Sequence, residues 1–332
     1  MSNPFSSVDE PYITVVVFVY NHSASIESAL HSILGQDYKN FEILILDDAS
    51  TDESSRIIER FIDTCDSHVQ IRFIRNITNC GFNRQVHRAV DEARGELIVE
   101  ADGDDTSKPS RLKNISSAWV KNGKTEAFIY SAFYTVVDGK LESPPIIFDD
   151  NIVKLDLGVD LRNFSVPLTG ATSAWTPGLI RKLAKYNSKI KHQDAILPIR
   201  ALLLAGKVIY LSSREVNYTI EAGSLSRPVS TGIGSRVANN SAYWRGMIAV
   251  FNQYSVDRSV VWGENATLRP RFESCLDRRV RALKGAYLVR YACLRMPLLS
   301  VLLGIVSRRN RWCYFSCFVR VGLLKVIAAI QG

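Results

Sequence analysis

Three carboxylates within four residues, Asp102, Asp104 and Asp105, form the group best suited to chemistry in this sequence of 332 residues. They repel one another, so the cluster is costly unless a cation or several hydrogen bonds offset that repulsion. Hard oxygen ligands suit Mg²⁺ or Mn²⁺, and Mg²⁺ typically combines one or two carboxylates with phosphate oxygens of a substrate. The spacing therefore predicts a divalent metal site. The alternative is a solvated acidic turn in which Asp105 or Thr106 begins a helix.

A second acidic pair, Asp47 and Asp48, could accept hydrogen bonds from a nucleotide base or a ribose hydroxyl, as acidic residues at strand ends do in dinucleotide folds. The alternative is helix capping: Ser50 and Glu53 match a capping box, and Asp52 suits the start of a helix. For Asp48 we favour ligand binding, because capping does not need a carboxylate that far upstream of the helix.

Strands and helices alternate in the segment that must position these residues. Continuous apolar runs predict buried strands at residues 13–19, 41–46, 69–74 and 96–100. Helices are expected from Ser23 or Ser25 to about Leu34, after Ser50, and at 85–93. This alternation predicts right-handed crossovers on a parallel sheet, in which ligands bind at the carboxyl ends of the strands. Three of the four strands end in polar clusters: Tyr20-Asn21, Asp47-Asp48, and residues 102–105, which include Gly103.

The downstream elements are less regular. The sequence predicts a strand at residues 128–137 that turns at Asp138-Gly139, and then an irregular connection over 144–168. Helices are expected at 177–186 and 194–205. Gly206 would end the second helix before a strand at 208–211.

The order of motifs strongly resembles the family 2 glycosyltransferases. The resemblance is carried by residues 19–22 (Val-Tyr-Asn-His), 32–43, 47–52, 94–98, 102–105 and 109–112 (Pro-Ser-Arg-Leu), which follow the family's spacing. It covers residues 10–115 well, the stretch to about 225 more loosely, and the tail not at all. It implies a GT-A type fold, a Rossmann-like α/β sandwich with a mainly parallel central sheet, over residues 1–225. A helical basic extension would occupy 226–332.

The resemblance also implies roles on the donor side. Tyr20 would lie against the nucleotide base, Asp48 would bind its imide edge, and Asp102 would lie near the ribose or the metal. Asp104 and Asp105 would hold the cation that bridges the diphosphate. We include Asn21, Asp47, Gly81 and Gly103 in the nucleotide-sugar site.

The segment after Gly81 departs from the family, which usually has two amide side chains where this chain has Gln85 and His87. Arg84 could contact a phosphate or could be a solvated helix residue. On the acceptor side, Asp194 matches the family's catalytic base, which usually follows a Glu, whereas Gln193 precedes it here. A helix N-cap role for Asp194 is compatible with catalysis. Residues 170–173 resemble an acceptor-facing loop ahead of a helix, and the absence of a Gln-x-x-Arg-Trp signature favours transfer of a single sugar.

Charge separates the tail from the rest of the chain. From Arg269 onward, 13 Lys and Arg residues face only Glu273 and Asp277, a net of +11, so the preceding residues sum to −3 within the total of +8. The apolar stretch at 296–306 is shorter than the roughly 20 residues that a spanning helix needs, and Arg320 and Lys325 interrupt the one at 312–330. A basic amphipathic segment on an anionic membrane surface fits both facts. A helical subdomain packed on the core is the alternative, and no nucleic-acid-binding module accompanies the charge.

The remaining composition favours a cytoplasmic location, with peripheral attachment to the membrane as an open possibility. Residues 1–11 are polar and contain no signal peptide, and the six cysteines form no C-x-x-C pair, so we expect reduced thiols.

We therefore expect a metal-dependent transferase that passes a sugar from a nucleoside-diphosphate sugar, typically a UDP-sugar, to an acceptor hydroxyl with inversion. The acceptor would be a lipid-linked saccharide or a polysaccharide precursor of the cell envelope. Two alternatives stay open. A nucleotidyltransferase would need a basic glycine-rich loop that Asn21-His22-Ser23 does not offer. An inactive relative acting as a membrane-bound scaffold would fit the changes at Gln193, Gln85 and His87.

Overall fold

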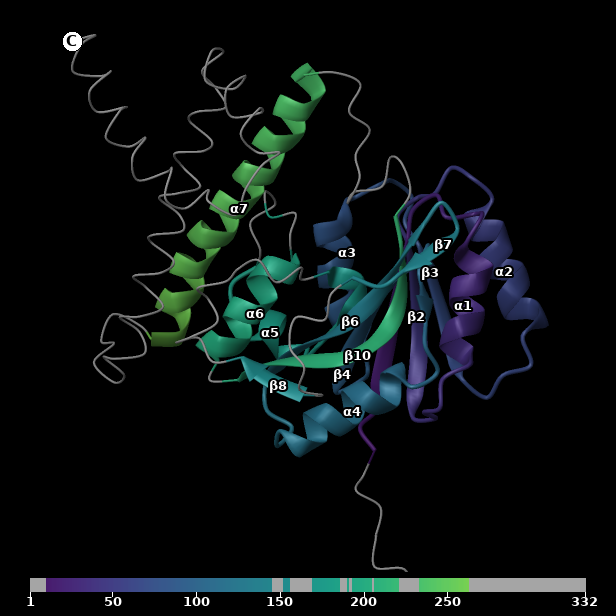
Figure 1. Ribbon diagram of the computed structural model, residues 1–332, viewed down its shortest axis with the longest axis horizontal. Helices are drawn as coiled ribbons and strands as arrows, with labels where there is room; N and C mark the ends of the chain where they lie inside the picture. The colour runs from purple at the N-terminus through teal and green to yellow at the C-terminus, as the bar shows by residue number, and fades with distance from the viewer. Residues whose placement is uncertain are drawn as a thin grey trace, which may run out of the picture.

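A mixed sheet of ten strands organises the computed structural model (Figure 1), which describes residues 10–144, 152–155, 169–185, 190, 193–204, 206–220 and 233–262. Along its main path the strand order is β3-β2-β1-β4-β9-β6-β10-β5, with β7 paired to β6 and β8 paired to β10. The strands are β1 Ile13–Val19, β2 Phe41–Asp47, β3 Gln70–Arg75, β4 Leu97–Asp102, β5 Thr106–Ser107, β6 Ala127–Val137, β7 Lys140–Glu142, β8 Ile152–Leu155, β9 Ser173–Trp175 and β10 Lys207–Thr219.

The half of the sheet from β3 to β4 is entirely parallel. Its connecting helices are α1 Ile26–Leu34, α2 Ser54–Thr64 and α3 Phe82–Glu92. Every residue of β1 and β2 is buried, as the continuous apolar runs indicated. The four predicted strands, their crossover helices and the mainly parallel arrangement are confirmed.

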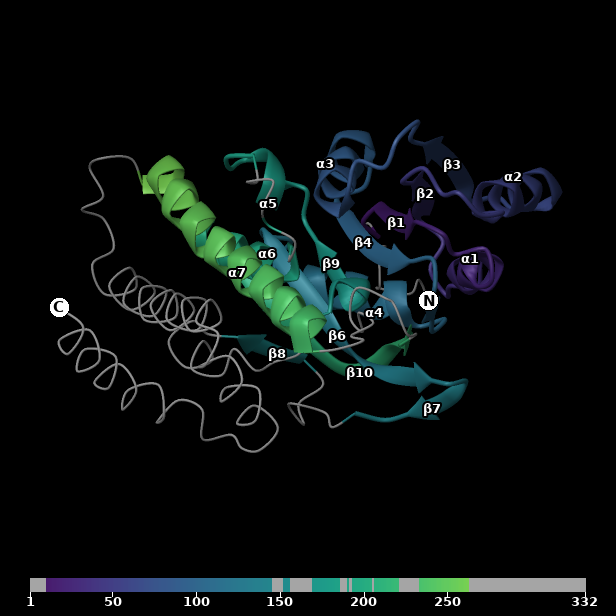
Figure 2. The ribbon, with the colours of Figure 1, turned by 90° about the horizontal axis from the view of Figure 1, so that it is seen from above.

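Two hydrophobic cores lie on opposite faces of the sheet. Along β1, Val15 and Val17 contribute to one core, while Val16 and Phe18 contribute to the other, because successive side chains of a strand point to opposite faces. The first core takes side chains from α1, α2 and α4 (Arg111–Lys121). The second takes them from α3, α5 (Gly178–Arg181), α6 (Gln193–Leu203) and α7 (Ile233–Trp262). Figure 2 shows these layers from above.

The other half of the sheet is mixed, because β9 interrupts the parallel arrangement. This short strand is antiparallel to both of its neighbours, β4 and β6, whereas β6 and β10 run parallel to each other. The strand predicted at 208–211 continues to Thr219 through register shifts after Leu211 and Arg214. The polar residues in that continuation concealed it, because they interrupt the apolar pattern on which the prediction rested.

Several local predictions were wrong. The expected helix at 177–186 is only the short α5, and the segment expected to be irregular contains β8. Residues 170–172 form a short 3₁₀ helix and Ser173 begins β9, so this segment leads into a strand rather than directly into a helix. The capping box is also wrong: α2 begins at Ser54 without a side-chain cap, and the Ser50 hydroxyl donates instead to Asp47 Oδ1 (2.6 Å).

Helix α7, the described part of the predicted extension, packs on α6 and contributes Val250, Phe251 and Tyr254 to the core. A fully buried ion pair joins the two helices, with Arg200 Nε 2.7 Å from Asp257 Oδ2. The basic segment from Arg269 onward, which carries the membrane prediction, lies outside the described residues. Among the helices that the structure describes, none is both long enough and apolar enough to cross a membrane.

Candidate active site

The carboxyl ends of β1, β2 and β4 meet at one edge of the sheet. The parallel register pairs Val19 with Asp47 and Phe18 with Asp102. Beyond the last pair, the backbone N–H of Asp48 donates to the Val19 carbonyl (2.9 Å), and that of Gly103 donates to the Phe18 carbonyl (3.0 Å). The three polar clusters predicted from the sequence therefore lie side by side.

The acidic cluster follows β4. Oxygen atoms of Asp102, Asp104 and Asp105 all lie within 4.8 Å of one another. The backbone N–H of Thr219, at the end of β10, donates to Asp105 Oδ1 (2.7 Å), whereas Asp105 Oδ2 is buried without a hydrogen-bond partner among the described residues. The alternative helix start is wrong, because Thr106 and Ser107 form β5 and pair with β10.

Electrostatics also favour a cation at this cluster. Burial, together with the charges of its acidic neighbours, raises the pKa of Asp102 and of Asp105. A divalent cation would relieve both effects, and the unpartnered Asp105 oxygen is a hard ligand of the kind that Mg²⁺ and Mn²⁺ prefer. The residues present therefore fit a divalent metal.

A buried cation, Arg111, lies behind the acidic cluster at the start of α4. Its guanidinium donates to the Glu100 and Ala171 carbonyls (2.7 Å each) and to Ser107 Oγ (3.0 Å). Burial lowers its pKa to about 10, although the surrounding carboxylates oppose that shift. Arg111 therefore stays charged at neutral pH and partly offsets the acidic cluster.

Asp48 is buried just after β2, where it organises the neighbouring loop. Its Oδ1 accepts hydrogen bonds from Asn76 Nδ2 (2.9 Å) and the Cys80 N–H (2.8 Å), and its Oδ2 accepts one from the Gly81 N–H (2.8 Å). Burial opposes ionisation, but these hydrogen bonds prevail and lower the pKa of Asp48. The Cys80 thiol contributes a further hydrogen bond, so a ligand that binds Asp48 would share or displace one of these contacts.

Asp47 is a correction to the predicted nucleotide contacts. It is fully buried, with its oxygens engaged by the Ser50 N–H and Oγ and by Ser55 Oγ, and Arg75 lies 3.6 Å away. A side chain so enclosed cannot reach a ligand, so Asp47 holds the turn after β2 instead.

Tyr20 and Asn21 follow β1. Tyr20 is 47% exposed, which leaves its ring free to stack on a base. Asn21 has a left-handed backbone (φ 59°), and its Oδ1 accepts a hydrogen bond from the Thr51 N–H (2.8 Å). The Asn21 side chain thus joins the loops after β1 and β2.

The start of α3 contains further candidates. Gly81 has a positive φ of 83°, and Arg84 is exposed, so both roles considered for Arg84 stay open. Gln85 is buried with neither amide atom hydrogen-bonded within the described part of the chain, and His22 Nδ1 is in the same situation beside Gly103. The sequence analysis assigned neither residue a role. The available signal was their position in the chain, because His22 lies in the loop after β1 and Gln85 lies in the first turn of α3.

The acceptor-side candidates come from the second half of the sheet. Asp194 lies in the first turn of α6, and burial raises its pKa to about 6. Burial, together with the nearby charges of Asp102 and Asp194, raises the pKa of Glu100 in β4. Glu100 is a residue that the sequence analysis missed, and the signal was a carboxylate within the apolar run of residues 97–101.

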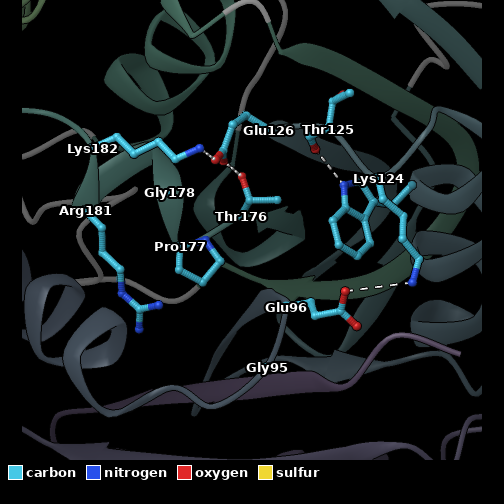
Figure 3. A pocket seen from close by; sticks show the side chains of 11 residues that line it. Gly95, Glu96, Lys124, Thr125, Glu126, Thr176, Pro177, Gly178, Arg181 and Lys182 are labelled. Carbon is cyan, nitrogen blue, oxygen red and sulfur yellow. Dashed lines mark hydrogen bonds and ion pairs between the residues drawn. The ribbon is translucent and has the colours of Figure 1, made fainter. Parts of the chain in front are cut away.

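An open pocket of about 360 Å³ lies at the opposite edge of the sheet. Its walls include Glu96, just before β4, and Glu126, just before β6, so it marks the amino ends of the parallel strands (Figure 3). Glu126 accepts a hydrogen bond from Thr176 and pairs with Lys182 (2.6 Å). These contacts hold strand ends together, and none of the predicted site residues lines the pocket.

Comparison with known proteins supports the resemblance. Residues 14–168 match the family described as Glycosyl transferase family 2. A curated relative, the undecaprenyl-phosphate 4-deoxy-4-formamido-L-arabinose transferase of Shewanella sediminis, is 29% identical over 164 residues, which are 47% of each chain. The chain spans about a third of the length of the curated relatives that it matches first.

Two solved structures share the fold. TarS of S. aureus in complex with UDP-GlcNAc is 17% identical, with a TM-score of 0.56 over 85% of this chain and 90% of that one. The mannosyltransferase PcManGT of Pyrobaculum calidifontis, in complex with GDP-Man and Mn²⁺, is 16% identical, with a TM-score of 0.52 over 91% of this chain and 81% of that one. At such identities the likeness concerns the fold alone, and it confirms the predicted α/β fold class.

Proposed function

Residues 14–168 belong to the family 2 glycosyltransferases, and from that premise we propose that the protein transfers a sugar from a UDP-sugar to an acceptor hydroxyl with inversion. The observation that carries the proposal is the acidic cluster beside an exposed tyrosine. Asp102, Asp104 and Asp105 converge where β1, β2 and β4 end, and Tyr20 is exposed at the same edge.

On the donor side, the Tyr20 ring would stack on the base and Asp48 would accept a hydrogen bond from its imide edge. A divalent cation, Mg²⁺ or Mn²⁺, held by Asp102, Asp104 and Asp105 would neutralise the charge that develops on the departing diphosphate. The likeness to structures that hold UDP-GlcNAc, or GDP-Man with Mn²⁺, supports this assignment.

On the acceptor side, Asp194 would remove the proton of the attacking hydroxyl. Inversion by direct displacement needs a base on the face of the sugar opposite the leaving diphosphate. The acidic cluster, as the diphosphate side, cannot serve. Burial places the pKa of Asp194 at about 6, so the carboxylate is ionised at neutral pH and still basic enough to accept a proton.

The acceptor that we propose is a lipid-linked saccharide or a polysaccharide precursor, and the site of action is the cytoplasmic face of the membrane. The name of the Shewanella relative, an undecaprenyl-phosphate transferase, supports a lipid-linked acceptor. The net charge of +11 from Arg269 onward favours an anionic surface. Deleting the residues after Asn265 should release the protein from anionic vesicles, and co-sedimentation at two salt concentrations measures this.

Donor binding and turnover test the function itself. In thermal melts with Mn²⁺ and a panel of nucleotide sugars, the true donor at 100 times its dissociation constant should stabilise the protein by about 2.7 kcal/mol. That donor should then be hydrolysed slowly without acceptor. Binding without hydrolysis or transfer would favour the inactive scaffold, and release of pyrophosphate from a nucleoside triphosphate would favour a nucleotidyltransferase.

A further inference from the structure

Glu100 is a buried carboxylate that the proposed transfer does not use. It is 1% exposed and occupies the fourth position of β4, whose preceding residues Leu97, Ile98 and Val99 are all fully buried and apolar. Burying a carboxylate costs free energy unless hydrogen bonds offset that cost. Packing alone would favour an apolar side chain here, so the contacts of Glu100 must account for its presence.

Two segments distant in sequence donate hydrogen bonds to the Glu100 carboxylate. Gln193 Nε2, from the first residue of α6, donates to Oε1 (2.8 Å). Ser173 Oγ, from the first residue of β9, donates to Oε2 (3.3 Å). Glu100 thus joins the strand that leads to the acidic cluster with the helix that carries Asp194.

Gly170 closes the turn of residues 170–173 over the Glu100–Gln193 pair. A Cβ atom at position 170 would lie 2.5 Å from Glu100 Oε1 and 2.6 Å from Gln193 Nε2, so a side chain there would break the contact. Arg111 reinforces the same junction, because its guanidinium bridges the carbonyls of Glu100 and Ala171. Both the backbone and the side chain of Glu100 are therefore tied to this turn.

The identity of residue 193 matters to this contact. An amide at 193 donates a hydrogen bond to Glu100, whereas a carboxylate at 193 would place two negative charges within hydrogen-bonding distance in a buried site unless the two groups shared a proton. The contact thus favours one acid and one amide.

We propose that Glu100 is a positioning residue for the acceptor side of the site: through Gln193 it fixes the first turn of α6, which presents Asp194, and through Ser173 it fixes the 170–173 turn. This inference rests on the proposed function. It assigns no contact between Glu100 and the substrate.

Exchange of the acid and the amide tests the proposal. Glu100→Leu should lower kcat by about 10- to 100-fold with a saturating donor and acceptor, because a small displacement of a base costs that much. UDP affinity should stay within about twofold, since the donor-side residues are untouched. Gln193→Glu alone should lower kcat similarly, and Glu100→Gln combined with Gln193→Glu should recover kcat to within about threefold of the parent.

Hydrogen–deuterium exchange gives a readout that does not require activity. In Glu100→Leu, exchange should accelerate at residues 170–173 and 193–196 and stay unchanged along β1 and β2. Glu126→Gln is the matched control, because it removes a mostly buried carboxylate with two partners at the opposite edge of the sheet. That variant should leave kcat and the exchange of both segments unchanged.

The outcomes separate this inference from the function. Parent-like turnover in Glu100→Leu, or a double variant no better than Gln193→Glu alone, would overturn the positioning role. If Glu100→Leu does not fold, the comparison of Gln193→Glu with the double variant decides. If the parent protein neither transfers nor hydrolyses any nucleotide sugar, the proposed function is wrong. If hydrogen–deuterium exchange is unchanged in Glu100→Leu, Glu100 does not fix the first turn of α6 or the 170–173 turn.

Discussion

The side chain of His22 lies so close to Gly103 that a Cβ atom at position 103 would be 2.4 Å from His22 Nδ1 and 3.2 Å from His22 Cβ. The loop after β1 is therefore seated against the backbone of the acidic cluster. Ser25 Oγ strengthens the contact by donating to the Gly103 carbonyl (2.9 Å). Position 103 of the acidic motif is thus restricted by His22.

Gly103→Ala should lower metal-dependent UDP affinity by about tenfold, because the crowded atoms include the root of the His22 side chain and cannot move without the loop. Calorimetry with and without Mn²⁺ measures the effect. Adding His22→Ala to Gly103→Ala removes the ring that causes the 2.4 Å overlap and leaves only the 3.2 Å approach to Cβ, so it should recover most of the affinity. A double variant as weak as Gly103→Ala would place the cause elsewhere.

Asp104→Ala should abolish the contribution of Mn²⁺ to nucleotide-sugar binding and leave the fold intact, because it removes a metal ligand and relieves repulsion in the cluster. Calorimetry in Mn²⁺ and in a chelator gives the comparison. Asp63→Ala, an exposed aspartate on α2, is the control and should bind as the parent does. Unchanged affinity in Asp104→Ala would sink the metal assignment.

Asp194→Asn should reduce turnover by about 10²–10⁴-fold while donor affinity barely changes, because it keeps the shape of the side chain but not its basicity. In the parent, kcat should rise with pH and level off above the pKa of about 6, since only the ionised carboxylate accepts a proton. The variant should lose that inflection. Steady-state rates across this pH range, with saturating substrates, test both points.

The metal-free protein should lose stability as pH rises through the raised pKa values of Asp102 and Asp105. Their ordinary pKa is 3.8, so above that value the folded state holds more protons than the unfolded state, and stability then falls with pH. Urea unfolding between about pH 5 and pH 8 measures the slope. Mn²⁺ should flatten it, because the cation binds the ionised carboxylates. A metal-free stability that rises over this range would contradict the assignment.

Asp257→Leu should destabilise the protein by about 3–5 kcal/mol, because it leaves the buried Arg200 guanidinium without its carboxylate. Arg200→Met combined with Asp257→Leu should recover most of the loss, since two apolar side chains then replace the ion pair. Denaturant unfolding of both variants provides the measurement. Equal losses in the two variants would mean that the ion pair is not the cause.

Local patterns predicted the donor half of the molecule well. The apolar runs at β1, β2 and β4 identified strands buried on both faces, and the residues after them led to the acidic cluster, because parallel strands end at a common edge. The capping box failed because Asp47, three residues upstream, competes for the Ser50 hydroxyl.

Contacts between distant segments could not be read from local patterns. Glu100 and Gln193 are 93 residues apart, and only the fold brings them to 2.8 Å. Their hydrogen bond also accounts for the amide at 193, where the sequence analysis found only a departure from the Glu that usually precedes the family's catalytic base. Asp105 likewise depends on Thr219, whose backbone N–H reaches it from a strand that the sequence analysis ended eight residues too early.

Strand β9, which runs antiparallel to both of its neighbours, also divides the proposed site along the chain. Every proposed donor-side residue lies between Tyr20 and Asp105, whereas the proposed base follows β9. Recombination within the segment between β5 and β6 could therefore join the donor-binding part of one protein to the acceptor-binding part of another. The hydrogen bond from the Thr219 backbone N–H to Asp105 could form after such a recombination, because any residue except proline supplies a backbone N–H. The side-chain contact between Glu100 and residue 193 is more demanding. An acceptor-binding part that brings a glutamate to position 193 would need an accompanying change at Glu100. Positions 100 and 193 should therefore covary among proteins that arose by such a recombination.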